Sequence, residues 1–150
     1  MPVESVSTDN ALPHVAGFEH PLRVYYEDTD AAGIVYHANY LRYMERARTV
    51  WLSSLGVEID QLVKQYAVLF AVRSLNVQYL RPARLNNHLI ATVWPERLGG
   101  ASLELDQRVF HEGELLTSAH VKLACVDAIT LLPKPWPQVL HELFNAWKMS

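Results

Sequence analysis

The sequence predicts an α+β fold in which a curved antiparallel sheet wraps around one long central helix. Two observations support this fold class. Apolar residues recur every three or four positions over residues 39–55, which is the period of a helix with one buried face. Most of the chain after residue 73 instead reads as strand segments separated by turns, which is typical of an antiparallel sheet. One helix covers only one face of such a sheet, so we expect another copy of the chain to cover the rest.

The first elements follow from local composition. Residues 22–26 are rich in strand-forming residues and alternate in polarity, which predicts a short strand. Residues 27–33 are acidic and prone to turns, so we expect a loop there. The helix should begin at Asn39 and run for about 16 residues, with Gly56 in the position of a glycine that ends a helix.

The later elements are separated by recognisable turns at Asn86-Asn87, Gly99-Gly100 and Glu112-Gly113. Several apolar residues share one face of the last two expected strands. The expected elements are strands over residues 74–79, 88–97, 101–111 and 116–126, followed by a short terminal helix over 139–147.

Composition limits the class of protein. The 150 residues are 50% hydrophobic and 19% charged, which fits one folded domain, expected over residues 21–150 behind a flexible tail of residues 1–20. The net charge of −3 lacks the basic excess of a nucleic-acid surface, so no nucleic-acid partner is expected. The lone cysteine, Cys125, excludes an intrachain disulfide and is expected to be a buried, inert thiol.

The sequence also bears on location. The first 22 residues contain no Lys or Arg and no apolar run, unlike a secretory signal, and the apolar stretch over 67–72 is too short to span a bilayer. We therefore expect a cytoplasmic enzyme, and peripheral association with a membrane stays open.

Chemistry concentrates in residues 26–40, which read YEDTDAAGIVYHANY. This run brings the carboxylate of Asp30, the flexible Gly33 and the imidazole of His37 to the start of the expected helix. The first N–H groups of a helix are unpaired and carry a partial positive charge, so they can stabilise an oxyanion. A carboxylate just upstream can attack a carbonyl carbon or activate water against it.

This run resembles the signature of the 4-hydroxybenzoyl-CoA thioesterase family of hotdog proteins, and is most similar to the acyl-CoA thioesterases associated with the Tol-Pal system of Gram-negative bacteria. The resemblance extends through ERART at residues 45–49, VQYLRPARL at residues 77–85 and CVD at residues 125–127, and spans roughly residues 22–135.

The resemblance implies hydrolysis of an acyl-CoA thioester. It assigns Asp30 as the catalytic carboxylate, either as nucleophile or as general base. His37 would lie at the helix start, with its backbone N–H facing the thioester carbonyl and its side chain assisting, and Tyr26 would line the site. It implies no metal or cofactor, and a homodimer or a tetramer of two dimers.

The remaining candidate residues are expected either to bind the substrate or to have a structural role only. CoA is phosphorylated, and Arg81 and Arg84, on either side of Pro82, are candidates to bind its phosphates, while Gly33 would let the substrate approach the backbone. Glu45 is expected to pair within the helix with Arg48 or Thr49. The seven histidines show no pair at ligand spacing, so no metal site is expected.

Two other functions stay open at this point. One is a hydratase or dehydratase that acts on acyl thioesters with the same fold, which would need a histidine paired with an acid. The other is a non-catalytic acyl-CoA-binding protein, since a fold does not determine a function.

Overall fold

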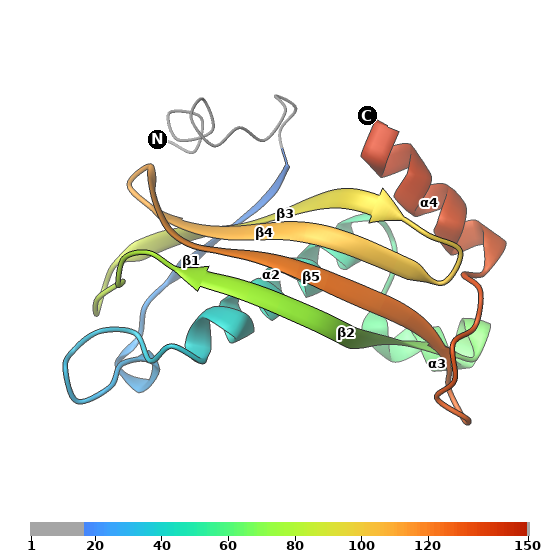
Figure 1. Ribbon diagram of the computed structural model, residues 1–150, viewed down its shortest axis with the longest axis horizontal. Coiled ribbons are helices and arrows are strands. Elements are labelled where there is room, and N and C mark those ends of the chain that lie inside the picture. The colour runs from blue at the N-terminus through green and yellow to red at the C-terminus, as the bar shows by residue number, and fades with distance from the viewer. Residues whose placement is uncertain (1–16, 150) are drawn as a thin grey trace.

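The computed structural model describes residues 17–149 of the chain. Five strands form a single sheet in the order β1-β3-β4-β5-β2, and every neighbouring pair is antiparallel (Figure 1). The strands are β1 (Phe18–Arg23), β2 (Val68–Tyr79), β3 (His88–Leu98), β4 (Ser102–His111) and β5 (Glu114–Asp127). The helical segments are η1 (Tyr26–Asp28), α2 (Asn39–Ser54), η2 (Ile59–Gln61), α3 (Leu62–Tyr66) and α4 (Gln138–Met149).

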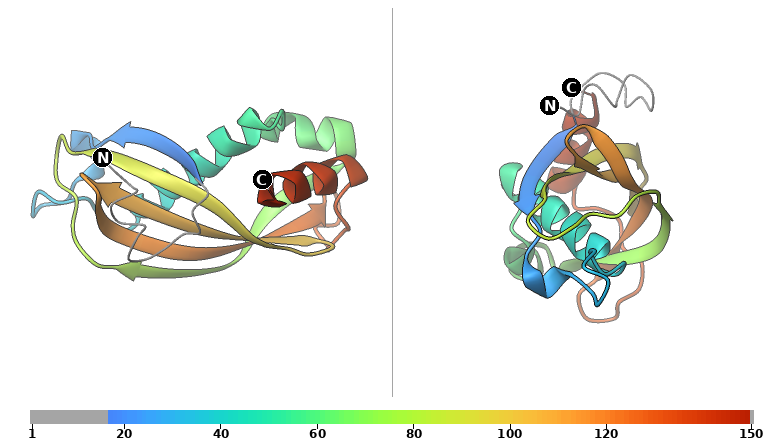
Figure 2. Two further views of the ribbon diagram at one scale, coloured as in Figure 1. Left: turned by 90° about the horizontal axis from the view of Figure 1, so that it is seen from above. Right: turned by 90° about the vertical axis from the view of Figure 1, so that its left-hand side faces the viewer.

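The sheet curves around α2, as the view along the helix shows (Figure 2). The apolar stripe of α2 supplies much of the core, because its side chains at helical spacing meet the inward residues of the strands. Buried residues of α2 include Tyr40, Tyr43, Met44, Ala47 and Trp51. The curved antiparallel sheet around one central helix agrees with the fold class expected from the sequence.

Helix α2 ends as its sequence predicts. Gly56 has φ +87°, a left-handed conformation that glycine adopts without strain. Its N–H donates to the carbonyl of Ser53, and the N–H of Val57 donates to the carbonyl of Leu52. This pair of hydrogen bonds is the Schellman arrangement that closes a helix, and it fixes where the chain leaves α2.

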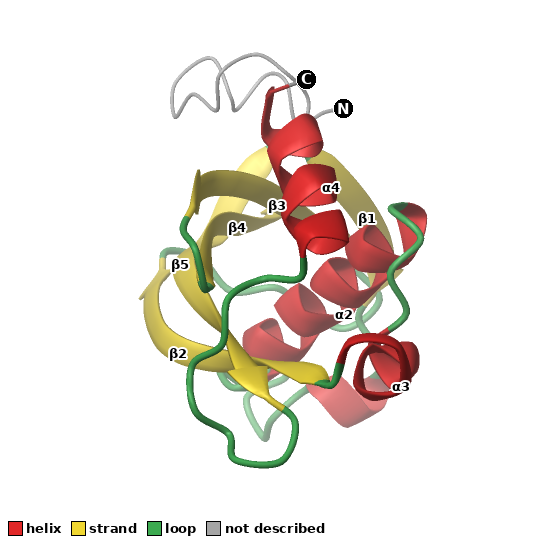
Figure 3. Ribbon diagram, turned by 90° about the vertical axis from the view of Figure 1, so that its right-hand side faces the viewer, coloured by secondary structure: helices red, strands yellow, loops and turns green. Residues whose placement is uncertain are grey.

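The C-terminal helix α4 packs across the end of the molecule opposite the start of α2 (Figure 3). Phe144 is buried there, and its ring stacks on Trp51 of α2 with centroids 5.9 Å apart. Trp136 and Phe70 add edge contacts at 5.2 Å, so this end is an aromatic cluster that holds the end of α2 in place. No helix in residues 17–149 is long and apolar enough to cross a membrane.

Three expectations for the secondary structure were wrong: the bounds of two strands, and the omission of one short helix. The first strand covers Phe18–Arg23 rather than residues 22–26, so the part of the expected tail after residue 17 is ordered in the sheet, while residues 1–16 lie outside the described residues. Strand β2 begins at Val68, six residues earlier than expected. The short helix α3 was not expected at all.

Strand β2 forms one edge of the sheet. It pairs with β5 along its length, with a register shift between Val72 and Ser74, and has no strand on its other side among residues 17–149. Most of its side chains are exposed, including the apolar Val72 and Leu75. A twelve-residue edge that carries exposed apolar residues is a surface suited to pairing with another strand.

Candidate active site

Asp30 lies at the start of a tight hairpin that leads into α2. Its N–H donates to the carbonyl of Ile34 at 2.9 Å, and Gly33 N–H donates to the carbonyl of Asp30 at 2.9 Å. Gly33 has φ +79°, which the turn requires and which a side chain would oppose. The hairpin therefore fixes the backbone of Asp30 relative to the helix that follows.

The carboxylate of Asp30 is exposed and only partly engaged. Its Oδ1 accepts a hydrogen bond from the N–H of Ala32 at 2.8 Å, which orients the group. Oδ2 has no hydrogen-bond partner within residues 17–149. One oxygen is thus held while the other can meet a substrate or a water molecule.

Asp28 has the opposite environment and the opposite role. It is 2% exposed, and its two oxygens accept hydrogen bonds from the N–H of Tyr25 at 2.8 Å and from Nδ2 of Asn39 at 2.7 Å. Asp28 therefore ties the motif loop to the first residue of α2. Burial, followed by the nearby charge of Asp28, raises the pKa of the Tyr43 phenol, so that phenol stays neutral.

The N-terminus of α2 is left open. Ala38 occupies the N-cap position and no side chain of the described residues caps the helix. Alanine is a poor N-cap because it offers no oxygen to the first N–H groups. The N–H groups of Asn39 and Leu41 already donate to the carbonyls of Tyr36 and Ala38, so the helix start offers a bound molecule its partial positive charge rather than a full set of free donors.

His37 stands just before this helix start with its ring exposed. Its ring lies 4.6 Å from the ring of Tyr36 and 6.1 Å from that of Tyr79, between centroids. The hydroxyl of Tyr79 donates to the carbonyl of His37 at 3.0 Å, which ties the end of β2 to the start of α2. No role was predicted for the Tyr79 hydroxyl, although this tyrosine lies in the segment of resemblance over residues 77–85.

A hollow of about 280 Å³ opens beside His37. It is lined by Ile34, Val35, His37, Tyr40, Tyr79 and Leu80, with Arg81 and Pro82 at its rim. Burial, and to a smaller degree the charges of Tyr79 and Asp30, raise the pKa of Tyr40, whose oxygen accepts a hydrogen bond from Ala83 N–H at 2.9 Å.

The remaining predicted site residues lie around the hollow at different distances. Arg81 is at its rim, and its Nε pairs with Glu114 at 2.7 Å. The backbone of Arg84 bridges to Ile34 beside the Asp30 hairpin, and its side chain is exposed. Tyr26 is 83% exposed on η1 and does not line the hollow. The fold therefore gathers Asp30, Gly33, His37 and both arginines at one end of the molecule, with Tyr26 on its outer surface.

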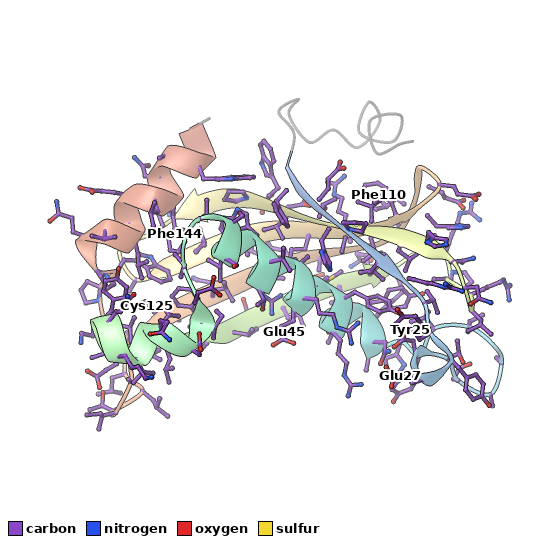
Figure 4. All side chains as sticks on the ribbon, turned by 180° about the vertical axis from the view of Figure 1, so that it is seen from behind. Tyr25, Glu27, Glu45, Phe110, Cys125 and Phe144 are labelled. Carbon is purple, nitrogen blue, oxygen red and sulfur yellow. The ribbon has the colours of Figure 1, made fainter. Side chains whose placement is uncertain are left out.

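A second depression of about 280 Å³ lies along the seam between α2 and β2. It is lined from α2 by Leu41, Met44 and Glu45 and from β2 by Val72 and Leu75, and the arginines Arg42 and Arg48 of α2 also line it. Figure 4 shows Glu45 halfway along α2, far from Tyr25 and Glu27 at the motif end.

A buried polar contact beneath this seam was missed. Arg48 of α2 donates to Oε1 of Gln107 at 2.9 Å, and Gln107 Nε2 donates to the carbonyls of Met44 at 2.9 Å and Thr92 at 3.3 Å. Burial lowers the pKa of Arg48, and the charge of Glu45 opposes this, which fits the expected attraction between these two side chains. The available signal was Gln107 itself, a polar residue among the inward apolar residues of β4.

Two other possibilities are a reactive cysteine and a metal site. Cys125 is fully buried, and burial raises the pKa of its thiol to about 11, so the thiol is protonated at neutral pH, as the sequence predicted for an inert residue. Among residues 17–149, no three His, Cys, Asp or Glu side chains lie where they could hold a metal ion together.

Comparison with known proteins places the chain. The model of the thioesterase superfamily matches residues 32–118. The chain is 38% identical over 132 residues to the acyl-CoA thioesterase YbgC of Haemophilus influenzae, a match that covers 88% of this chain and 97% of that protein. It is 41% identical over 129 residues to the acyl-CoA thioester hydrolase YbgC of Escherichia coli, covering 85% of this chain and 96% of that protein.

The fold has solved counterparts. A crystal structure of a probable thioesterase from Bartonella henselae matches with a TM-score of 0.78 and 32% identity, over 81% of this chain and all of that one. The hotdog fold expected from the sequence is therefore confirmed, as is the resemblance on which it rested. The chain belongs to the thioesterase superfamily.

Proposed function

We propose that this protein hydrolyses acyl-CoA thioesters to a carboxylic acid and free CoA. One observation carries the proposal: the carboxylate of Asp30 keeps one oxygen free in the hairpin that leads into α2, and the start of α2 borders the hollow beside His37. Thioester hydrolysis needs these parts, namely a group that delivers oxygen to the carbonyl and donors for the oxyanion. The activities named for the YbgC relatives support the same assignment.

Two routes suit this geometry. As nucleophile, Asp30 attacks the thioester carbon, the C–S bond breaks, CoA leaves as a thiolate that takes a proton, and water then opens the acyl-aspartyl anhydride. As general base, Asp30 takes a proton from water as its oxygen attacks the same carbon, the C–S bond then breaks, and the CoA thiolate takes up a proton. In both routes the N–H groups near His37 stabilise the oxyanion, and the imidazole of His37 assists from beside the hollow.

The substrate-binding roles follow from position. The acyl group would enter the apolar seam between α2 and β2, while the CoA end would lie outside the hollow. Arg84 and Arg81 would meet the CoA phosphates, although Arg81 must first exchange its contact with Glu114. Gly33 would allow the substrate close to the hairpin, and Tyr26 would contact the exposed part of CoA.

We also propose that the working unit is a homodimer joined through β2, alone or as half of a tetramer. The exposed edge of β2 with its apolar Val72 and Leu75 supports this, because antiparallel pairing of two copies would satisfy the edge and cover the seam. The proposed location is the cytoplasm, where a lone buried cysteine suits reducing conditions. Cell fractionation would distinguish this location from peripheral attachment to the inner membrane.

The test is thiol release from a panel of short, long and aromatic acyl-CoAs by the wild-type protein and by Asp30→Asn. We expect hydrolysis by the wild type and a fall of at least 100-fold in kcat for the variant, because an amide neither attacks the carbonyl nor accepts a proton from water. Undiminished hydrolysis by Asp30→Asn would refute the role of Asp30.

The same assay separates the competing functions. Hydration of an enoyl-CoA without thiol release would favour the hydratase. Binding of acyl-CoA, measured by calorimetry, without any turnover would favour the non-catalytic binding protein. Either result would replace thioester hydrolysis as the function.

A further inference from the structure

The last residue of β2 holds the peptide group that leads into α2. The hydroxyl of Tyr79 donates to the carbonyl of His37 at 3.0 Å, across 42 residues of sequence. A phenol carries one proton, so a hydroxyl that donates to His37 cannot also donate to a substrate. Figure 1 shows the end of β2 and the start of α2 at the same end of the molecule. This hydrogen bond therefore acts on the backbone of the candidate site.

The backbone around His37 is a turn with two free donors. Asn39 N–H donates to the carbonyl of Tyr36 at 2.8 Å, which places His37 and Ala38 at the centre of the turn. Within residues 17–149, the N–H groups of these two central residues have no hydrogen-bond partner. They are the donors that the start of α2 still offers to an oxyanion.

The directions of these two N–H groups are set from the opposite ends of their peptide groups. The C=O and N–H of a trans peptide share a plane and point in opposite directions. The peptide group that carries the His37 N–H is held through the carbonyl of Tyr36 by the N–H of Asn39. The peptide group that carries the Ala38 N–H is held through the carbonyl of His37 by Tyr79. In the described part of the chain, Tyr79 is thus the one side chain that fixes a free donor of this turn.

The side chain of Tyr79 is itself held in place. Its ring meets that of Tyr40 edge to face, with centroids 5.7 Å apart. The hydroxyl of Tyr40 accepts a hydrogen bond from Ala83 N–H at 2.9 Å, so this second ring is anchored to the backbone. A tyrosine side chain has only two rotatable χ angles, so a packed ring delivers its hydroxyl to a defined point.

We propose that Tyr79 is a positioning residue for thioester hydrolysis, which holds the turn over residues 36–39 so that its two free N–H groups meet the oxyanion. The inference rests on the proposed function and deepens it, because it assigns control of the oxyanion donors to a side chain of β2. Such donors act when they lie about 2.7–3.1 Å from the oxygen, so a rotated peptide plane loses most of their effect. The oxyanion forms in the transition state, and the loss therefore falls on kcat rather than on substrate binding.

Kinetics compares two tyrosines whose rings lie near that of His37. Tyr79→Phe removes the hydroxyl and keeps the ring. Tyr36→Phe is the matched control, because the Tyr36 ring lies 4.6 Å from that of His37 and its hydroxyl has no hydrogen-bond partner within residues 17–149. We expect Tyr79→Phe to lower kcat about tenfold with KM within about twofold of wild type, and Tyr36→Phe to change neither. An unchanged kcat in Tyr79→Phe would overturn the proposal.

Infrared spectroscopy reads the donors without turnover. Butyryl-CoA and benzoyl-CoA, labelled with carbon-13 at the carbonyl, are bound to Asp30→Asn, to Asp30→Asn/Tyr79→Phe and to Asp30→Asn/Tyr36→Phe. Hydrogen bonds to a carbonyl oxygen lower its stretching frequency. We expect the same low frequency in Asp30→Asn and its Tyr36→Phe derivative, and a higher one when Tyr79→Phe is added. A merely structural hydroxyl would change the melting temperature alone, so equal frequencies in all three variants would overturn the proposal.

The competing role for this hydroxyl is acid catalysis, in which it gives its proton to the sulfur of the leaving thiolate. In that case the pH profile of kcat would have an alkaline limb in the wild type that Tyr79→Phe lacks, and this result would overturn the positioning role. We expect profiles of the same shape, with that of Tyr79→Phe lower throughout.

The positioning role and the proposed activity fail in different ways. If the wild type hydrolyses no acyl-CoA but the carbonyl frequency still rises with Tyr79→Phe, Tyr79 still sets the donors to a bound carbonyl and only hydrolysis fails. If Asp30→Asn abolishes hydrolysis while Tyr79→Phe changes neither kcat nor the frequency, hydrolysis stands and the positioning role is overturned.

Discussion

Asp28 and Asp30 are separated by one residue, yet they have different environments and different roles in the fold. Asp28 is buried and binds two backbone or side-chain donors, whereas Asp30 is exposed and keeps one oxygen free. The sequence could assign both to an acidic loop, and the resemblance singled out Asp30. It could not show that Asp28 anchors Asn39, because that contact depends on how the loop folds back on the helix.

Replacing Asp28 by Asn tests this anchor. Asparagine has one acceptor oxygen where two donors need one each, so an N–H would face the donor of Tyr25 or Asn39. We expect a loss of about 1–3 kcal/mol in the free energy of unfolding, measured by urea denaturation. The control is Glu27→Gln, an exposed neighbour, with an expected change within about 0.5 kcal/mol. Equal losses in the two variants would contradict the anchoring role.

At the scale of elements, α2 is seated on the sheet by an apolar stripe and by one polar contact. The stripe was visible as a period in the sequence, so the helix and its glycine end were predicted correctly. The contact between Arg48 and Gln107 was not predicted, because the two residues are 59 positions apart in the sequence and only the fold brings them together.

Gln107→Leu tests that contact. Leucine has a similar volume, so the main effect is loss of an acceptor for Arg48 and of donors to two carbonyls. We expect destabilisation of about 2–3 kcal/mol by urea denaturation. Adding Arg48→Met should recover much of this loss, because no buried charge is then left unpaired. A double variant as unstable as the sum of its parts would contradict this account.

The strands were harder to predict than α2, for identifiable reasons. Strand β1 contains Pro21, which reads as a break but is tolerated on an edge strand. The first part of β2 is an unbroken apolar run, in which alternation gives no signal. The sequence could single out Asp30, Gly33 and His37 as candidates because they lie within one motif. Tyr79 and the α2–β2 seam join the site only through the fold.

The whole molecule should lose stability in alkali. Burial raises the pKa of Cys125 from 9.0 to about 11, and burial also raises those of Tyr40 and Tyr43 above 10.0. Groups whose pKa is raised on folding stabilise the protein below their unfolded pKa, and this contribution is lost as pH rises toward the folded value. We expect the free energy of unfolding to fall from about pH 9 upward. Urea denaturation across pH 7–11 would measure it, and Cys125→Ala should show a shallower fall. The same slope in that variant would mean that the thiol contributes nothing.

The proposed dimer makes stability depend on concentration. If β2 pairs with its copy, the middle of each strand lies near the twofold axis. This holds even if the register of the pairing differs by one or two residues. Ser74→Lys places two added charges beside the two copies of Arg73, and like charges at this separation repel. We expect at least a tenfold rise in the dimer Kd by analytical ultracentrifugation, and a melting temperature that rises with protein concentration in the wild type. Gln65→Lys adds the same charge on α3 and should leave Kd unchanged. A dimer that tolerates Ser74→Lys as well as Gln65→Lys would have to join through a surface other than the β2 edge.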